Sequence, residues 1–447
     1  MKKRQFFSPR FVFAVVVLAM ATILAMSFTL ASFNDIETST ASTASAWTSS
    51  NWTQTSQTDF GSGVLRFVDV TAGGSAQLTL GPFALRGNSS NLTWRYSPLG
   101  NNWTAQAQTP GNVVNGGEMV YDGGSYVYAT QGGSTAFWRY DVLANSWTTM
   151  ASTPASTGAG CDLAYDGGDY IYAFRGGSTT TFYRYSISGN SWTTRTAAPA
   201  TIGAGGSLAY DGGDYIYAFR GRSTTTFYRY SISGNSWATR TAAPATISGG
   251  GSLAYDGGDY IYAFRGGATT FYRYSISGNS WTTRTAAPGS IGSGGALAYD
   301  GNNYIYALRG GSQTTFYRYS ISGNSWGTMT AAPATISAGG TLSGMIALGS
   351  VASQVLDTTV AGSRWDGLFW DETLPAGTNI TFEVRASDTS FLETDAAPSW
   401  TSVGDTSPVI SGLPAGRYKQ WRAILSTANV TQTPALNEVR TYYYGPQ

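Results

Sequence analysis

Histidine is absent from the 447-residue sequence, and cysteine occurs once, at Cys161. Without histidine the chain has no Ser-His-Asp or Cys-His nucleophile arrangement and no histidine-based zinc, copper or iron site. A single cysteine forms no internal disulfide, which leaves a buried free thiol or a bond to another chain as alternatives for Cys161. No paired-cysteine motif or phosphate-binding P-loop is present either. The sequence therefore predicts no catalytic residue, no metal site, no cofactor and no enzyme activity.

Charge is also scarce. Charged residues make up 11% of the chain, against roughly 25% in an average soluble domain. Of the 26 Lys and Arg residues, four lie within the first ten positions. The rest of the chain therefore has 22 basic residues and 25 acidic ones. The rest of the chain thus has no basic excess to displace phosphate counterions, which argues against a nucleic-acid partner.

Residues 1–31 predict a membrane-directing segment. A basic flank, residues 1–10, precedes the 21 uncharged residues from Phe11 to Ala31. This run is longer than the apolar core of most signal peptides and long enough to cross a bilayer as one transmembrane helix, with the basic flank on the cytoplasmic side. We expect either a signal anchor or a cleaved signal peptide. In both cases the remainder is exported, either to the cell surface as extracellular domains or by secretion.

A repeated unit occupies the middle of the chain. Tryptophans recur every 44 or 45 residues, each preceded seven residues earlier by a tyrosine, at Trp103, Trp147, Trp192, Trp237, Trp281 and Trp326. Within one unit, residues 252–267 predict two short strands joined by an Asp-Gly-Gly turn, and residues 270–285 predict a second hairpin. Four strands in about 44 residues match one blade of a β-propeller.

The unit resembles the kelch repeat. Its second strand ends in a double glycine, as at Gly176-Gly177, and its second hairpin carries Tyr-x6-Trp. The resemblance covers residues 73 to 340, and it implies that the strand before each Asp-Gly turn is the innermost strand of its blade. A degenerate first copy and a closing strand at Gly339–Leu348 then give six blades. The type indicated is an exported, membrane-anchored prokaryotic one.

Outside the repeats the composition and the pattern of apolar residues change. Residues 32–58 are rich in Ser and Thr and predict a spacer. Residues 346–447 alternate apolar and polar residues between turns, and they resemble the β-sandwich modules of secreted surface proteins. Gln57–Val70 is a candidate to pair with this sandwich. The predicted fold is all-β: a helix at 1–31, the spacer, a six-bladed kelch-like propeller at 59–345 and a sandwich at 346–447.

Two arginine series repeat with the blades. One lies between aromatic residues in Phe-Tyr-Arg-Tyr, where stacking on tyrosine or pairing across blades is expected. The other is Arg175, Arg220, Arg265 and Arg309, with Gln131 in the same position of an earlier unit. We expect these four side chains near the mouth of the propeller channel. They are the candidate ligand-binding residues, for carboxylates, phosphates or acidic sugars, and the alternative is that they cap carbonyl groups at strand ends or pair with neighbouring aspartates.

The carboxylates of the Tyr-Asp-Gly-Gly-Asp segments also have two interpretations: turn chemistry, or a calcium or acid-base site. Each carboxylate recurs in several blades, which favours the turn, because a catalytic pair is needed only once.

Four tryptophans near the C-terminus also have two interpretations, a sandwich core or a platform for sugar stacking. They are Trp365, Trp370, Trp400 and Trp421.

Near-identical blades present the same surface several times, which suits binding better than catalysis. The sequence therefore predicts a cell-surface scaffold or adhesin whose partner is an extracellular protein, a glycan or another copy of itself, with membrane attachment through the N-terminal helix. The alternative is a carbohydrate-active propeller that acts on an acidic sugar at the channel mouth.

Overall fold

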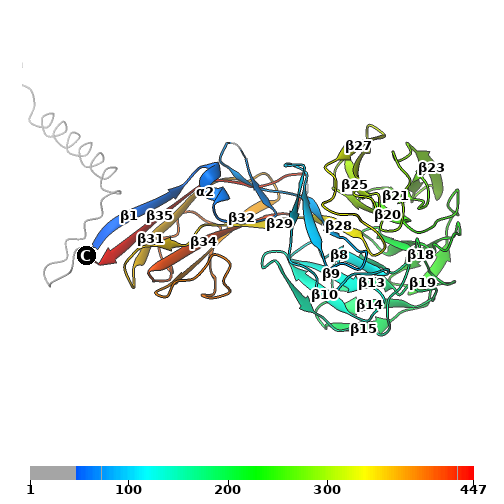
Figure 1. Cartoon of the computed structure of the whole chain (residues 1–447), viewed down its shortest axis with the longest axis horizontal. Coiled ribbons are helices and arrows are strands. Elements are labelled where there is room, and N and C mark those ends of the chain that lie inside the picture. The colour runs from blue at the N-terminus through cyan, green and yellow to red at the C-terminus, as the bar shows by residue number, and fades with distance from the viewer. Residues whose placement is uncertain (1–46, 72, 430, 447) are drawn as a thin grey trace, which may run out of the picture. The chain divides into compact units, whose positions relative to one another are not determined.

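A computed structural model describes residues 47–71, 73–429 and 431–446 of the chain (Figure 1). Strands predominate in this part, with one short helix, α2 (Gln57–Gly61). Among these residues there is no helix with the length and apolar character that a membrane crossing needs. The expected membrane-directing segment, residues 1–31, lies outside them. The end of the expected spacer is structured, since it contains β1 (Trp47–Gln54) and the start of α2.

The middle of the chain folds into six four-stranded antiparallel sheets, named here repeat sheets 1 to 6. Repeat sheet 1 contains β5 (Gly81–Leu85), β6 (Thr93–Ser97), β7 (Asn102–Ala105) and β28 (Thr341–Ile346); repeat sheet 2 contains β8 (Gly117–Tyr121), β9 (Tyr126–Gln131), β10 (Phe137–Asp141) and β11 (Ser146–Thr149); repeat sheet 3 contains β12 (Asp162–Tyr165), β13 (Tyr170–Phe174), β14 (Phe182–Ser186) and β15 (Ser191–Thr194). Repeat sheet 4 contains β16 (Ser207–Tyr210), β17 (Tyr215–Phe219), β18 (Phe227–Ser231) and β19 (Ser236–Thr239); repeat sheet 5 contains β20 (Ser252–Tyr255), β21 (Tyr260–Phe264), β22 (Phe271–Ser275) and β23 (Ser280–Arg284); repeat sheet 6 contains β24 (Ala296–Tyr299), β25 (Tyr304–Leu308), β26 (Phe316–Ser320) and β27 (Ser325–Met329).

One edge strand from each of these sheets contributes to a closed ring. Strands β8, β12, β16, β20, β24 and β28 each contact the next, and β28 contacts β8. Because β28 pairs with β5 in repeat sheet 1, the last repeat strand joins the sheet that holds the first three. This is a propeller-like, almost entirely β arrangement. It includes the expected strand within Gly339–Leu348.

The repeated Tyr and Trp residues connect neighbouring sheets. In repeat sheet 3, the indole Nε1 of Trp192 donates to the carbonyl of Ala151, which follows repeat sheet 2, at 2.8 Å. The hydroxyl of Tyr185 donates to Asn190 Oδ1 at 2.7 Å, and the same oxygen accepts the N–H of Ala151 at 2.9 Å. The Trp192 ring also meets Phe137 of repeat sheet 2 edge-on, with 4.9 Å between centroids. The Tyr and Trp spacing thus serves the contact between adjacent sheets.

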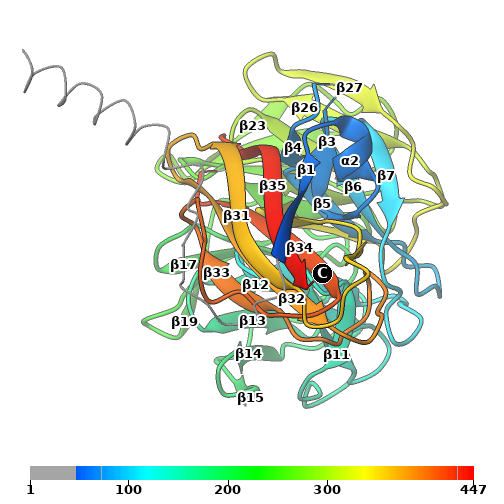
Figure 2. The ribbon, with the colours of Figure 1, turned by 90° about the vertical axis from the view of Figure 1, so that its left-hand side faces the viewer.

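The remaining strands form two further sheets. Sheet A contains β1, β3 (Val68–Val70), β4 (Ala76–Leu78), β31 (Arg364–Thr373) and β35 (Ala435–Pro446), and Figure 2 shows β1, β35 and β31 side by side. Sheet B contains β2 (Val64–Arg66), β29 (Leu348–Ala352), β30 (Leu356–Asp357), β32 (Thr378–Ser387), β33 (Thr401–Gly404) and β34 (Tyr418–Thr427). Residues of both sheets, such as Val439 and Phe382, belong to one hydrophobic core.

The start of the repeated part differs from the prediction. Val64–Arg66 pairs with β29, and Ala76 and Gln77 pair with β35, so residues 59–80 belong with the C-terminal strands and the repeats begin at Gly81. A short alternating segment shows that it is a strand but does not identify its partner strand, which explains the error. The pairing that Gln57–Val70 was expected to make with the C-terminal part is present.

Side chains join the two parts of the described chain. Phe67, between β2 and β3, has a φ of +50° and is 1% exposed. Its ring lies 6.4 Å from that of Phe83 in repeat sheet 1. The guanidinium of Arg95 lies 3.0 Å from the Asp69 carboxylate of β3. The chain also passes between the two parts twice, from β4 to β5 and from β28 to β29. These connections and contacts hold repeat sheet 1 against sheets A and B.

Candidate functional site

The four candidate arginines occupy equivalent positions directly after the second strand of repeat sheets 3 to 6. Each Nε donates to a backbone carbonyl in the segment that leads into its own sheet, at 3.0 to 3.2 Å: Arg175 to Ser156, Arg220 to Thr201, Arg265 to Thr246 and Arg309 to Ser290. Gln131 makes the corresponding bond through Nε2 at 3.1 Å. The arginines thus bind carbonyl groups in the segments that connect the sheets, and not at the ends of the named strands.

These arginines do not line the channel. Glycine, alanine, serine and asparagine residues, with Glu118 and Cys161, surround the channel opening. The four guanidinium groups are half-buried, and their terminal Nη atoms have no hydrogen-bond partner among the described residues. The Nε of each arginine is therefore structural, while its outer nitrogens remain able to bind an anion.

The other repeated charges have structural partners. In repeat sheet 3, Asp166 Oδ1 accepts the N–H groups of Gly168 and Tyr170 at 2.9 and 3.1 Å, which closes the hairpin turn. Asp169 accepts the hydroxyl of Ser186 at 2.7 Å. The guanidinium of Arg184 stacks on the ring of Tyr170 at 4.0 Å. Turn chemistry and cation–π packing therefore account for both the aspartates and the arginines between aromatics.

The channel holds two carboxylates that sequence reasoning missed. One inward position recurs in the six inner strands, and it is occupied by Glu118, Asp162, Ser207, Ser252, Ala296 and Thr341. The Ser207 and Ser252 hydroxyls accept the N–H groups of Leu253 and Leu297 in the next sheet, each at 3.1 Å. Asp162 accepts that of Leu208 at 2.6 Å in the same way. The sequence did contain a signal for them, because Glu118 and Asp162 of two adjacent units occupy the position that is serine in repeat sheets 4 and 5.

Burial sets the protonation of this pair. The Glu118 carboxylate accepts the Thr341 hydroxyl, and it accepts the N–H of Met119 at 3.1 Å. Burial, followed by repulsion from Asp162, raises the pKa of Glu118 well above its usual value. Burial also raises the pKa of Asp162 to about 6. The adjoining Cys161 is a buried free thiol, and its pKa is raised first by burial and then by Glu118.

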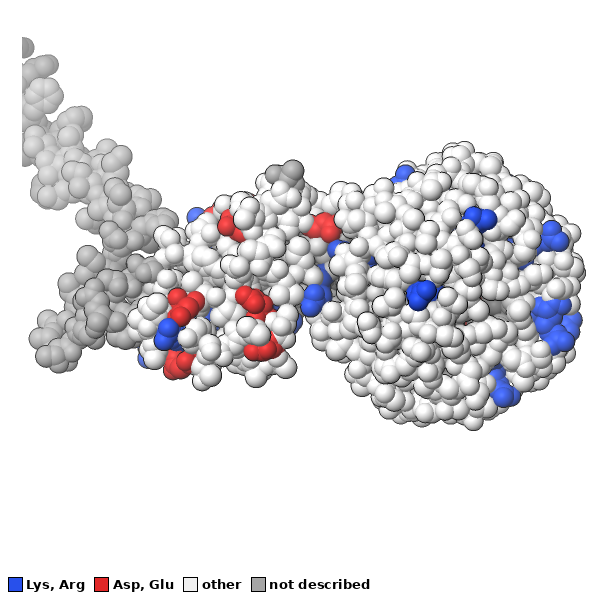
Figure 3. Space-filling model, viewed as in Figure 1, with Lys and Arg blue, Asp and Glu red and all other residues white. Residues whose placement is uncertain are grey.

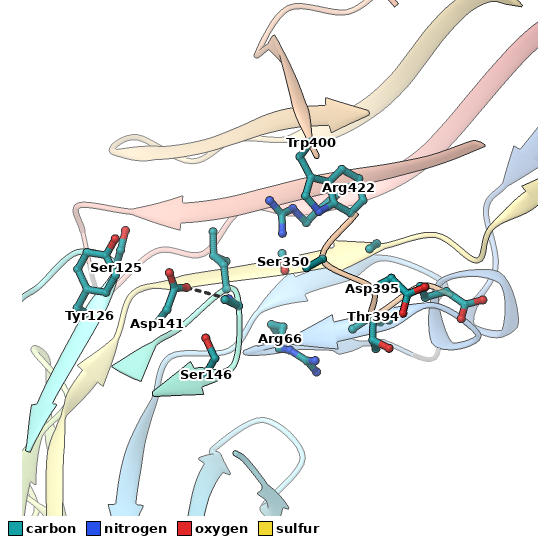
Figure 4. A pocket seen from close by; sticks show the side chains of 16 residues that line it. Arg66, Ser125, Tyr126, Asp141, Ser146, Ser350, Thr394, Asp395, Trp400 and Arg422 are labelled. Carbon is teal, nitrogen blue, oxygen red and sulfur yellow. Dashed lines mark hydrogen bonds between the residues drawn. The ribbon is translucent and has the colours of Figure 1, made fainter. Parts of the chain in front are cut away.

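A larger cavity, of about 640 Å³, lies between sheet B and repeat sheet 2 (Figure 4). Figure 4 shows Tyr126 and Asp141 on one side and Asp395 on the other, with Arg66 and Ser350 between them. Sequence reasoning did not bring these residues together, because they come from four distant segments. Arg66 and Asp141 were not singled out at all.

One C-terminal tryptophan lines this cavity and the other three belong to the core. Trp365, Trp370 and Trp421 are 7%, 6% and 1% exposed and pack in the core between sheets A and B. Trp400, just before β33, is half-buried and borders the cavity. The expectation of a core role is confirmed for the first three, while Trp400 is placed where a ligand could reach it.

The sequence matches no protein-family model and no curated protein. Among solved structures, the chain is similar to one titled "Structure of YjhT". The similarity has 15% sequence identity and a TM-score of 0.41, and it covers 49% of this chain and 84% of that one. The repeated four-stranded sheets themselves establish the propeller-like fold.

Proposed function

We propose that this chain is an exported surface protein that acts by binding and not by catalysis. In this proposal a six-bladed kelch-like β-propeller, formed by the repeat sheets, is inserted into a β-sandwich formed by sheets A and B. The N-terminal segment holds the protein at the membrane or is removed on secretion. The partner is an extracellular protein, a glycan or a second copy of the chain.

The observation that carries the proposal is that most of the repeated charged side chains have the same structural partners in each repeat. Turn aspartates, stacked arginines and the Tyr-Asn-Trp contacts recur from sheet to sheet with the same partners. Residues 165–200 and 210–245 differ at only two positions. Such copies offer one surface several times, which favours multivalent attachment over a single catalytic pocket.

The surface supports the same proposal. In Figure 3, basic atoms are scattered over the repeat sheets, with almost no acidic atoms among them, while acidic atoms gather on the part formed by sheets A and B. Arg175, Arg220, Arg265 and Arg309 contribute outer nitrogens that have no hydrogen-bond partner among the described residues. They favour an acidic glycan or an acidic protein surface as partner. The same arginines are what a carbohydrate-active propeller would use, and that remains the alternative function.

A binding screen with charge-neutral variants tests the proposal. Residues 47–447 would be applied to a glycan array beside a variant in which the four arginines become glutamine. Glutamine is the matched choice, because Gln131 already makes the same carbonyl contact without a charge. Selective binding of acidic glycans by the parent protein only would support a guanidinium-dependent site.

Turnover of a bound glycan would favour the enzyme alternative. If no glycan on the array is bound, the purified protein would be sedimented at rising concentration and screened against surface proteins. Self-association or a protein partner would support the scaffold role. A monomer that binds neither glycan nor protein would contradict the proposal.

A further inference from the structure

Repeat sheet 2 departs from the other repeats where it borders the large cavity. Asp169 of repeat sheet 3 is replaced there by Ser125, and Ser186 is replaced by Asp141, so the two residue types have exchanged places. In repeat sheet 3 the carboxylate of Asp169 is bound by the Ser186 hydroxyl and a backbone N–H. In repeat sheet 2, Asp141 Oδ1 accepts the N–H of Ala144 at 2.8 Å. Its other oxygen has no partner among the described residues and is available to the cavity.

The floor of the cavity is the face of sheet B that points away from the core. Residues alternate along a strand, so Val351 enters the core between the sheets while Ser350 points the other way. Ser350 is 2% exposed, and its hydroxyl makes no hydrogen bond to another residue of the described chain. The Nε of Arg66 is likewise buried without a partner, and its Nη1 donates to Leu65 at 3.2 Å. The floor thus holds polar groups that lack partners among the described residues.

A buried arginine fixes the loop at the opposite edge. Arg385, 1% exposed, donates to the carbonyls of Asp395, Glu393 and Leu392 at 2.6, 2.9 and 3.1 Å. It also donates to Gln420 at 2.8 Å. The loop that carries two carboxylates to the cavity is therefore held in place before any ligand arrives, which lowers the entropic penalty of binding.

An indole ring completes the cavity. The guanidinium groups of Arg385 and Arg422 each lie 4.5 Å from the ring of Trp400. Both arginines project from the same face of sheet B, since Glu383 is paired with Arg422 and precedes Arg385 by two residues. Trp400 thus lies against both guanidinium groups, and it lines the cavity together with Arg422.

The balance of charge identifies the ligand class. Glu383 neutralises Arg422, whose Nε lies 2.9 Å from the Glu383 carboxylate. Among the residues that line the cavity, Arg66 is then the unpaired positive charge, and Asp141, Glu393 and Asp395 are the negative charges. Carboxylate acceptors are in excess, so an anionic ligand is disfavoured. Hydroxyl groups, hydrogen-bond donors and acceptors and an aromatic ring in the lining suit a neutral polyhydroxylated ring. A volume of about 640 Å³ is within the range of about 300–1,000 Å³ usual for small-molecule pockets.

We infer that this cavity is a binding site for a neutral saccharide of more than one ring. The inference rests on the proposed binding function and adds a site and a ligand class to it. The hydroxyls of the sugar would donate to the free oxygen of Asp141 and accept from Arg66. One ring would pack against the Trp400 indole where it lines the cavity, and Ser350 would gain a partner.

The experiment is calorimetric titration of the full chain in detergent with neutral disaccharides of gluco, galacto and manno configuration, and with a glucuronate-containing disaccharide. The first variant, Ser125→Asp with Asp141→Ser, gives repeat sheet 2 the arrangement of the other repeats, so it is expected to fold. The matched control, Asp214→Ser with Ser231→Asp, makes the reverse exchange in repeat sheet 4, away from the cavity. Both variants keep the net charge. A third variant, Arg66→Gln, probes the floor.

Saturable binding of a neutral disaccharide is expected, with an affinity about tenfold weaker in the first and third variants and unchanged in the control. Equal affinity in all four proteins would overturn the site, and so would the absence of binding to every neutral sugar. Preference for the glucuronate sugar would overturn the ligand class. In each of these cases the arginine-dependent array binding could persist, so the proposed function would be judged separately.

Discussion

The guanidinium of Arg95 in repeat sheet 1 lies 3.0 Å from the carboxylate of Asp69 in sheet A, and the two side chains are 6% and 22% exposed. This ion pair joins the propeller-like part to the strands that flank it. A buried charge that loses its partner is far more costly than an exposed one.

Asp69→Ala should therefore lower the free energy of unfolding by about 3 kcal/mol, because it leaves Arg95 charged and unpaired. Asp357→Ala is the matched control, since it breaks the exposed pair with Arg417, whose side chains are 38% and 40% exposed. Its effect should be small. Urea denaturation followed by fluorescence measures both, and equal losses would show that the Arg95 pair does not stabilise the junction.

Trp237→Phe should cost about 1 kcal/mol, because phenylalanine keeps most of the ring packing but loses one hydrogen bond. That bond joins indole Nε1 to the carbonyl of Thr196 at 2.9 Å, in the segment that follows repeat sheet 3. The change in melting temperature measures the loss. The same substitution at Trp281 should give a similar value, since its bond to Thr241 is also 2.9 Å. Widely different values would mean that the repeats are not energetically equivalent.

Glu118→Gln should stabilise the fold near neutral pH. The raised pKa values of Glu118 and Asp162 mean that the folded state binds more protons than the unfolded state, so stability falls as pH rises from about 4 through about 6 and beyond. Glutamine keeps an oxygen for Thr341 and Met119 but removes one charge. We expect a gain of roughly 1–2 kcal/mol near neutral pH and a flatter dependence on pH.

Melting curves recorded over this pH range provide the measurement. Asp405→Asn, which alters an exposed carboxylate, serves as the control and should leave the pH dependence unchanged. A Glu118→Gln curve parallel to that of the parent protein would show that the channel pair does not titrate between the folded and unfolded states.

Cys161 should react slowly with a thiol reagent while the protein is folded. Burial raises the pKa of its thiol well above the usual value, so little thiolate forms at about pH 8. The reaction should reach the rate of a free thiol in concentrated guanidinium chloride. A dinitrobenzoate release assay reports both rates, and rapid labelling of the folded protein would contradict the buried position.

The repeats could be predicted from the sequence because their interactions are local. The Asp166 turn and the Tyr185 contact with Asn190 join residues four or five positions apart, and the period shows each of them several times. The pairing of β2 with β29 joins residues nearly 300 positions apart, and nothing in an alternating segment identifies such a partner.

The candidate sites show the same limit. The Arg175 series was visible because it repeats, although its bond to a carbonyl was only one of the alternatives. Glu118 and Asp162 come together because inner strands converge on one axis, and Arg66 and Trp400 line one cavity only once sheet B is assembled. Contacts between segments that occur only once in the chain, such as those around the large cavity, carry no periodic signal.

The position of β28 has a consequence for synthesis. A ribosome delivers β5, β6 and β7 long before residues 341–346, which complete their sheet. Strands β2 and β4 likewise lack their partner strands, β29 and β35, until these have been synthesised. Strands β2, β4 and β5 to β7 therefore emerge with open strand edges, and their sheets stay incomplete until β28, β29 and β35 have been made. A chain terminated before β28 would lack both the closed ring and the paired flanking sheets, so truncated products should be recognised by proteases as unfolded.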